Sequence, residues 1–239
     1  IGHLSGSLRD MTRTLYDRIE AIESFAADVA HELKNPLTSL RSAVETWPLA
    51  KSDESRMRLL DVIKHDVQRL DRLISDISNA SRLDAELARV DAEPVDVLRL
   101  AETVVDVANS IRSGEQIKTH LIRGEGLSSP QAATIIGYDS RLGQVLNNLI
   151  DNAKSFSEPN REIRVTVTRE RDAVVITVDD DGPGIPSHAF EKIFDRFYTD
   201  RPNGGFGENS GLGLSISRQI IEAHRGRIWA ENRINAQGH

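Results

Sequence analysis

The 239-residue sequence predicts an α+β protein in which an antiparallel helical hairpin precedes a two-layer sandwich of helices and strands. Apolar residues recur at spacings of three and four through the first third of the chain, as they do in paired helices. Later segments alternate between short helical patterns and runs of alternating apolar and polar residues, which are typical of half-buried strands. Hydrophobic residues make up 38% of the chain, which is enough for a folded core.

The first predicted helix carries a seam of apolar residues. Residues 1–15 follow a 3-4-3-4 spacing, as in a coiled coil. Ile19 and Ile22 fit this seam only if one extra four-residue step is inserted before them, a stutter that locally unwinds a coiled coil. Similar spacing continues over residues 25–47, so we expect one long helix up to that point.

A turn is predicted between Pro48 and Asp53, because proline and a Ser/Asp cluster interrupt the helical pattern there. A second helix with the same apolar spacing follows over residues 60–77. Two helices alone cannot cover apolar stripes of this width, so we expect two hairpins to pair as a dimeric four-helix bundle. The sequence therefore predicts a homodimer.

From about residue 94 the chain changes to shorter elements. Helices are expected at residues 99–112, 141–152 and 212–224. Strands, mainly antiparallel, are expected at residues 95–98, 117–122, 134–136, 163–168, 174–178 and 227–230, with the fourth and fifth forming a hairpin. Residues 195–210 are rich in Gly and Asn and predict a mobile loop.

Composition narrows the functional classes. Asp and Glu outnumber Lys and Arg by 37 to 30, which argues against a nucleic-acid-binding protein. Cysteine is absent, which excludes disulfides and cysteine-based zinc sites. No apolar run approaches the roughly 18 residues that a membrane span needs. Because the chain begins within a helical pattern and without Met, we expect a soluble fragment of a longer protein.

His31 is the first candidate reactive group. It lies opposite the apolar stripe of its helix, with Glu32 beside it and Asn35 one turn further along the same face. Pro36 has no backbone N–H to donate, which predicts a weakened or bent helix at this point. These features suit a reactive site, and a solvated surface histidine is the alternative. A zinc-protease motif is excluded, because it requires histidine where Asn35 stands.

A second candidate site follows the predicted strand 174–178. Asp180 is placed to accept a hydrogen bond from an exocyclic amine, and Gly182 and Gly184 would let the backbone approach a flat base closely. The alternatives are an acidic surface turn and an adventitious cation site.

Two further segments suit phosphate and its metal ion. Gly211 and Gly213 open the last predicted helix, where unpaired N–H groups and the helix dipole favour phosphate, although glycine also occurs there for backbone reasons. Asn148 and Asn152 lie one turn apart on the preceding helix, and their amide carbonyls could hold a hydrated magnesium ion. Helix capping or surface polarity is the alternative for the asparagines.

Taken together and in this order, the motifs resemble those of bacterial sensor histidine kinases, and within that family the ChvG-type sensors. The segments similar to the family's H, N, G1, F and G2 boxes are residues 31–36, 148–153, 180–184, 190–198 and 210–214. The resemblance covers residues 22–232. It implies the last helix of a HAMP linker at 1–18, a dimerisation and histidine phosphotransfer domain at 19–90, and a GHKL-type ATP-binding catalytic domain at 91–239.

The resemblance implies that ATP and Mg²⁺ are bound and that His31 accepts the γ-phosphoryl group. Glu32 would orient the ring and take its proton, and Asn35 would orient a water for phosphatase activity. The phosphoryl group would pass to an aspartate of a cognate response regulator receiver domain. In the nucleotide site, Asp180, Gly182 and Gly184 would hold adenine, Asn152 and Asn148 the magnesium ion, and Gly211, Leu212, Gly213 and Leu214 the phosphates, beneath a lid at residues 199–210. The full-length protein would be anchored in the bacterial inner membrane, with this fragment in the cytoplasm.

Several positions depart from the family pattern. Ser155 stands where a basic residue is usual, and Lys154 is one position earlier, turned by about 100° around the helix. Phe156 replaces a common tyrosine, and Asn209 replaces the first G2-box glycine. Two other functions stay open: another GHKL-type ATPase, and a dimeric signalling scaffold with a degenerate nucleotide site. The remaining histidines are expected on the surface: His3, His65, His120, His188, His224 and His239.

Overall fold

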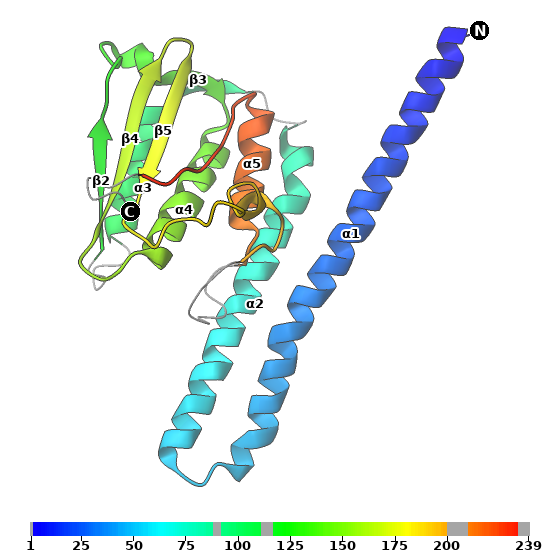
Figure 1. Cartoon of the computed structure of the whole chain (residues 1–239), viewed down its shortest axis with the longest axis vertical. Helices are drawn as coiled ribbons and strands as arrows, with labels where there is room; N and C mark the ends of the chain where they lie inside the picture. Colours follow the sequence, from blue (N-terminus) through cyan, green and yellow to red (C-terminus); the bar gives the residue numbers. More distant parts are fainter. Residues whose placement is uncertain (1, 88–91, 111–116, 200–209, 234–239) are drawn as a thin grey trace. The chain divides into compact units, whose positions relative to one another are not determined.

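Figure 1 shows the computed structural model of the chain, which describes residues 2–87, 92–110, 117–199 and 210–233. The chain forms two compact units, Ile1–Ile77 and Ser78–His239, called here the helical unit and the mixed unit. The helical unit contains α1 (Gly2–Thr46), the 3-10 turn η1 (Trp47–Leu49) and most of α2 (Asp53–Leu87).

The two long helices run antiparallel, as the apolar spacing predicted (Figure 1). Pro48 lies in the turn between them, and the Ser52 hydroxyl accepts a hydrogen bond of 3.1 Å from the backbone N–H of Ser55. A serine side chain in this position satisfies one of the unpaired N–H groups at the start of α2. The predicted turn is therefore confirmed.

Helix α1 does not end at Pro36. It continues for ten residues beyond the proline, to Thr46, and Pro36 itself is buried. A proline inside a helix removes one backbone hydrogen bond at a cost of about 3 kcal/mol. Packing of this stretch against α2 offsets that cost, because an amphipathic helix gains most of its stability from tertiary contacts.

The mixed unit contains two small sheets. The first pairs β1 (Glu93–Asp96) with β3 (Thr134–Gly137), and the second has the order β2 (Lys118–Arg123), β4 (Glu162–Glu170), β5 (Ala173–Asp179). Its helices are α3 (Val97–Ser110), α4 (Asp139–Phe156) and α5 (Gly213–Ala223), with short 3-10 turns η2 (Pro130–Ala133) and η3 (Lys192–Phe194). Helices α3 and α4 cover one face of the three-stranded sheet (Figure 1).

The core of the mixed unit lies between this sheet and the two helices. Val165 and Val167 of β4 are fully buried against Val104 and Ala101 of α3 and Ile150 of α4. Arg164, Thr166 and Thr168, which alternate with the two valines, are only partly buried, and this is the alternation that predicted the strand.

The predicted β4–β5 hairpin is confirmed. The strands pair antiparallel, and Arg171 and Asp172 connect them. Arg171 has φ 49°, the left-handed conformation that tight hairpin turns require.

Two of the three strand pairings are antiparallel, in agreement with the expectation of mainly antiparallel strands. The third differs, because β2 pairs parallel to β4. The chain between them includes β3 and α4, and a helical crossover of this kind is what parallel pairing requires. The predicted strand at residues 227–230 does not form. Just beyond this segment, the side chains of Asn232 and Arg233 bond to the loop after β5.

The predicted loop at 195–210 falls largely outside the described residues, as do Asn209 and the proposed lid. Its described beginning, residues 195–199, is irregular. Crossing a bilayer takes a long apolar helix with few charges, and none occurs in the described part of the chain.

Candidate functional site

The helical unit carries His31 on the outward side of α1. The side chains of His31 and Asn35 are both exposed, in agreement with their predicted position opposite the apolar stripe. Glu32 points toward α2, where its Oε2 accepts a hydrogen bond of 2.9 Å from Arg69 Nη2. Both members of this ion pair are largely shielded, with side-chain exposures of 25% and 16%. The imidazole therefore faces solvent while the carboxylate beside it is held in place.

Arg69 was not predicted as a site residue. It lies 37 residues beyond Glu32, on the other helix of the hairpin. No local motif marks it. Only the antiparallel alignment of the two helices, counted outward from the Pro48 turn, would have placed Arg69 opposite Glu32.

In the mixed unit, Asn148 joins α4 to the start of α5. Its Nδ2 donates to the carbonyl oxygen of Gly213 at 3.1 Å and lies 3.3 Å from the hydroxyl of Ser217. Asn152 follows one turn later and is half-buried. The structure therefore brings together the predicted magnesium-binding helix and the glycine-rich helix start, and leaves the carbonyl oxygen of Asn148 as its acceptor group.

Gly211 meets the segment that resembles the F box. Its φ is +74°, and its carbonyl oxygen accepts a hydrogen bond of 2.9 Å from the backbone N–H of Phe197. A Cβ at this position would lie 2.8 Å from the Cα of Phe197, closer than real Cβ contacts allow. Leu212 is fully buried, so only its backbone can face a phosphate, and Leu214 is half-buried within the first turn of α5.

Gly211→Ala is expected to destabilise the mixed unit by about 1–3 kcal/mol, because it adds a left-handed alanine and displaces Phe197. ATP affinity should fall with it. Calorimetric melting and ATP titration of the same sample measure both effects. Gly143→Ala is the matched control, since a Cβ there would lie 3.5 Å from Leu100 Cδ1, an ordinary contact. A Gly211→Ala melting temperature equal to that of the wild type would contradict the assigned constraint.

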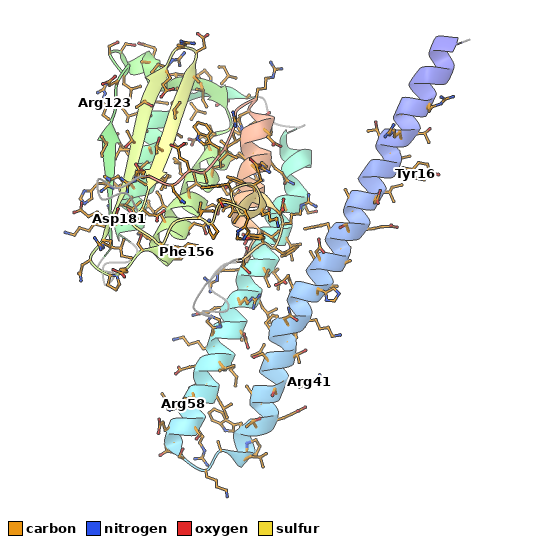
Figure 2. All side chains as sticks on the ribbon, viewed as in Figure 1. Tyr16, Arg41, Arg58, Arg123, Phe156 and Asp181 are labelled. Carbon is orange, nitrogen blue, oxygen red and sulfur yellow. The ribbon has the colours of Figure 1, made fainter. Side chains whose placement is uncertain are left out.

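The loop after β5 presents Asp180 at the surface. Asp180 Oδ1 accepts a hydrogen bond of 2.8 Å from the backbone N–H of Gly182, which shapes the turn. A Cβ on Gly182 would lie 2.7 Å from this carboxylate oxygen and 3.1 Å from the carbonyl oxygen of Phe156. Gly184 has φ +77°. Figure 2 shows Asp181 and Phe156 at the same end of the mixed unit. Both glycines are therefore needed for the shape of this loop.

Lys154 is buried inside the mixed unit. Its Nζ donates to the carbonyl oxygen of Ala108 at 2.8 Å, so it ties α4 to α3. This lysine stands one position earlier than the basic residue of the family pattern, and its side chain therefore points into the protein. Ser155, which stands at the usual basic position, donates its hydroxyl to the backbone of Asn152.

Two of the expected surface histidines, His65 and His224, are only partly exposed, whereas His120 and His188 are exposed. His224 is half-buried, its Nε2 accepts the backbone N–H of Tyr138 at 3.0 Å, and its Nδ1 lies 2.7 Å from the carbonyl oxygen of Ile220. A neutral ring protonated on Nδ1 satisfies both contacts. Gly137 makes room for the ring, because a Cβ there would lie 2.6 Å from it. His224 therefore links the end of α5 to the start of α4.

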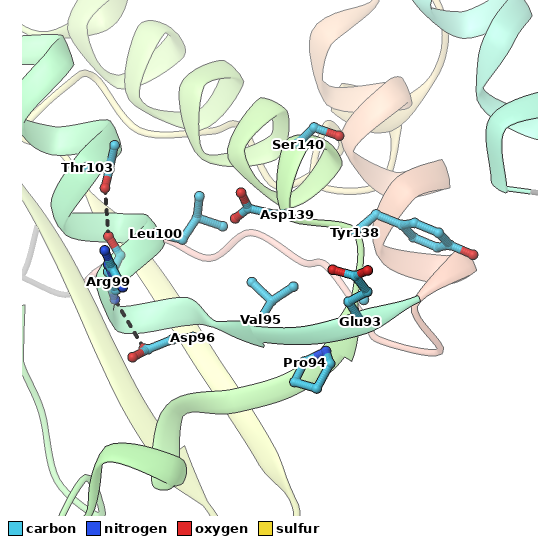
Figure 3. A pocket seen from close by; sticks show the side chains of 11 residues that line it. Glu93, Pro94, Val95, Asp96, Arg99, Leu100, Thr103, Tyr138, Asp139 and Ser140 are labelled. Atoms are coloured by element: carbon cyan, nitrogen blue, oxygen red, sulfur yellow. Dashed lines mark hydrogen bonds between the residues drawn. The ribbon is translucent and has the colours of Figure 1, made fainter. Parts of the chain in front are cut away.

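An open hollow of about 690 Å³ lies elsewhere in the mixed unit, between β1, α3 and the start of α4 (Figure 3). None of the site residues predicted from the sequence lines it. Asp96, one of its lining residues, already accepts the backbone N–H groups of Leu98 and Arg99 at the start of α3. The hollow therefore has no part in the site described above.

Comparison with known proteins decides the family. Residues 21–86 match the family model of the His Kinase A (phospho-acceptor) domain, and residues 137–238 match the histidine kinase-, DNA gyrase B- and HSP90-like ATPase model. The chain is 30% identical to the catalytic domain of histidine kinase ThkA, of which it covers 90%, with 61% of this chain covered and a TM-score of 0.52. This chain belongs to the sensor histidine kinase family.

A curated relative of this histidine kinase is the sensor protein ChvG of Rhizobium meliloti (strain 1021), with 58% identity over 97% of the chain. The kinase chain spans only 41% of the length of that relative. A solved structure of ThkA in complex with the response regulator protein TrrA resembles the kinase over 92% of its chain and 60% of that one, with 25% identity and a TM-score of 0.67. The phospho-acceptor model contains His31, and the ATPase model contains the candidate nucleotide residues from Asn148 to Leu214.

Proposed function

We propose that this histidine kinase phosphorylates itself on His31 with ATP and Mg²⁺, and then passes the phosphoryl group to an aspartate of a response regulator. The observation that carries the proposal is the pairing of two sites in one chain. An exposed imidazole with an anchored carboxylate occupies the helical unit, and a loop and helix start suited to a nucleotide occupy the mixed unit.

The glycines and the donor set of the mixed unit fit a bound nucleotide. A side chain at Gly182 or Gly211 would collide with the backbone or carboxylate beside it, so both segments can present bare backbone to a ligand. The amide oxygens of Asn148 and Asn152 are neutral ligands of the kind a hydrated magnesium ion accepts. Asp180 would accept the exocyclic amine of adenine, and the N–H groups from Gly211 to Leu214 would face phosphate.

In the proposed reaction a ring nitrogen of His31 forms the new P–N bond as the bond from the γ-phosphorus to the bridging oxygen breaks and ADP leaves. The proton on the other ring nitrogen goes to Glu32, whose carboxylate is held by Arg69. Magnesium, when bound, neutralises phosphate charge. Most of the rate enhancement comes from positioning and charge neutralisation, since phosphoryl transfer asks little covalent chemistry of a protein. Asn35, which is exposed on α1, would orient a water for phosphatase activity.

The remaining assignments also rest on the family resemblance. We place a HAMP-linker helix at 1–18, the dimerisation and phosphotransfer domain at 19–90, and the catalytic domain at 91–239. The full-length protein is proposed to be anchored in the bacterial inner membrane, with this part on the cytoplasmic side.

Incubation with γ-labelled ATP and Mg²⁺ tests the activity. We expect label on the protein that is labile in acid and stable in base, as a P–N bond is, and that leaves the kinase when a suitable receiver domain is added. ADP release without labelled protein would favour another GHKL-type ATPase. If calorimetry detects no binding of magnesium-ATP, the remaining function would be a dimeric signalling scaffold with a degenerate nucleotide site.

A homodimer is proposed because large apolar side chains stay exposed along both helices of a single hairpin. They include Leu37 and Val44 on α1 and Val67 and Ile74 on α2. Ile74→Glu is expected to shift the sedimenting species from dimer toward monomer, because a charge would be buried between the hairpins. Gln68→Glu adds the same charge at an exposed polar position of α2 and should leave the dimer intact. A wild-type chain that sediments as a monomer would contradict the assignment.

A further inference from the structure

The last described residues of the chain hold the loop after β5. Arg233 contacts three consecutive residues with one guanidinium group. Its Nε lies 3.2 Å from Asp179 Oδ1, and its Nη2 lies 3.0 Å from Asp181 Oδ1 and donates to the backbone carbonyl oxygen of Asp180 at 3.2 Å. A planar guanidinium suits this task, because its donors diverge in a fixed geometry.

Asn232 holds the other end of the same loop. Its Oδ1 accepts the backbone N–H of Ile185 at 2.9 Å, and its Nδ2 donates to the carbonyl oxygen of Ile185 at 2.8 Å. The two bonds imitate the pairing of a neighbouring strand. Gly184 permits this approach, since a Cβ there would lie 3.2 Å from Asn232 Oδ1. Two adjacent side chains therefore pin both ends of the segment from Asp179 to Ile185.

Asp179, Asp180 and Asp181 have different hydrogen-bond and ion-pair partners. Arg233 pairs with the carboxylates of Asp179 and Asp181, and Arg164 adds a contact of 3.7 Å to Asp181. For Asp180, Arg233 binds the backbone, while the side chain accepts the N–H of Gly182. Neighbouring carboxylates repel one another, and a shared cation removes much of that repulsion. The middle carboxylate is thereby kept exposed and oriented.

We propose that Asn232 and Arg233 are positioning residues that hold Asp180 to receive the exocyclic amine of adenine, and so set the preference for this base. The inference rests on the proposed function, in which Asp180 accepts that amine. It adds residues outside the five motifs, just beyond the strand that was predicted at residues 227–230.

The test is calorimetric titration of the full chain with ADP and with IDP, whose base carries a carbonyl in place of the amine. Arg233→Ala should weaken ADP binding about tenfold, which corresponds to about 1.4 kcal/mol of lost ADP affinity, and IDP binding less than about twofold. Asn232→Ala should act in the same direction. Arg233→Lys should keep part of the preference for ADP over IDP, because lysine retains the positive charge but lacks the diverging N–H donors of the guanidinium group. Arg227→Ala, in the same segment over the ring of Trp229, is the matched control and should change neither affinity.

A double mutant tests whether Arg233 acts on ADP binding through Asp180 or through the general stability of the unit. In an Asp180→Asn background, Arg233→Ala should weaken ADP binding no further, because the acceptor it positions is already lost. Equal loss of ADP and IDP affinity, or an Arg233→Ala variant with wild-type discrimination, would overturn this inference and leave the kinase assignment standing. A wild-type chain that binds neither nucleotide would overturn the proposed function, and the inference with it.

Discussion

Asp180→Asn is expected to weaken the binding of magnesium-ATP by about 10- to 100-fold, since a hydrogen bond to a charged group contributes about 1.5–3 kcal/mol. The substitution keeps a carbonyl oxygen for the N–H of Gly182, so the turn should persist. It removes the charge and sets an amide donor against the donor of the base. Calorimetric titration measures the loss, and the melting temperature should stay near that of the wild type.

Asp172→Asn provides the control. Asp172 is exposed in the β4–β5 turn of the same unit, so the same chemical change there should leave nucleotide affinity unaltered. Equal affinity of Asp180→Asn and wild type for ATP would show that the loop after β5 does not recognise the base, and would remove the nucleotide site from the account.

His31→Gln should abolish acid-labile labelling from γ-labelled ATP, because glutamine has no nucleophilic ring nitrogen to form the P–N bond. Its affinity for magnesium-ATP should match that of the wild type, since the candidate nucleotide residues belong to the other unit. Together, labelling and ATP affinity distinguish loss of the phosphoryl acceptor, His31, from loss of the bound ATP that donates the phosphoryl group. Asp180→Asn should lose both labelling and binding.

His120→Gln is the matched control for the acceptor. His120 is exposed on β2, 3.5 Å from Glu162, and stands in none of the motifs. It should label as the wild type does. Persistent acid-labile label in His31→Gln would mean that another side chain accepts the phosphoryl group.

The parts of the fold that follow from local sequence were predictable. The 3-4 spacing predicts α1 and α2, and the turn at Pro48 follows from a helix breaker and a capping serine. The alternation in β4 and the apolar run in β5 predict two strands, and the short link between them leaves antiparallel pairing as the only close arrangement.

Features that depend on distant residues were not predictable in this way. The direction of β2 relative to β4 is set by the crossover between them, and periodicity within a strand carries no information about its direction. Residues 227–230 have a strand-like pattern but do not form a strand, and the residues just beyond them, Asn232 and Arg233, contact the loop after β5 through their side chains.

The same reason explains the site residues that were missed. The reactive residues stand in compact motifs, whereas their supports come from elsewhere in the chain. Arg69 reaches Glu32 across the hairpin, and Arg233 reaches Asp181 across 52 residues. His224 looked isolated in the sequence because Tyr138, its partner, lies 86 residues away.

The most direct measurement is the location of the transferred group. The wild-type chain would be incubated with magnesium-ATP, digested at alkaline pH to preserve a P–N bond, and mapped by mass spectrometry. The account predicts one added phosphoryl group, on the imidazole of His31. A phosphoryl group found on any other side chain, or ADP formed with none on the protein, would contradict it.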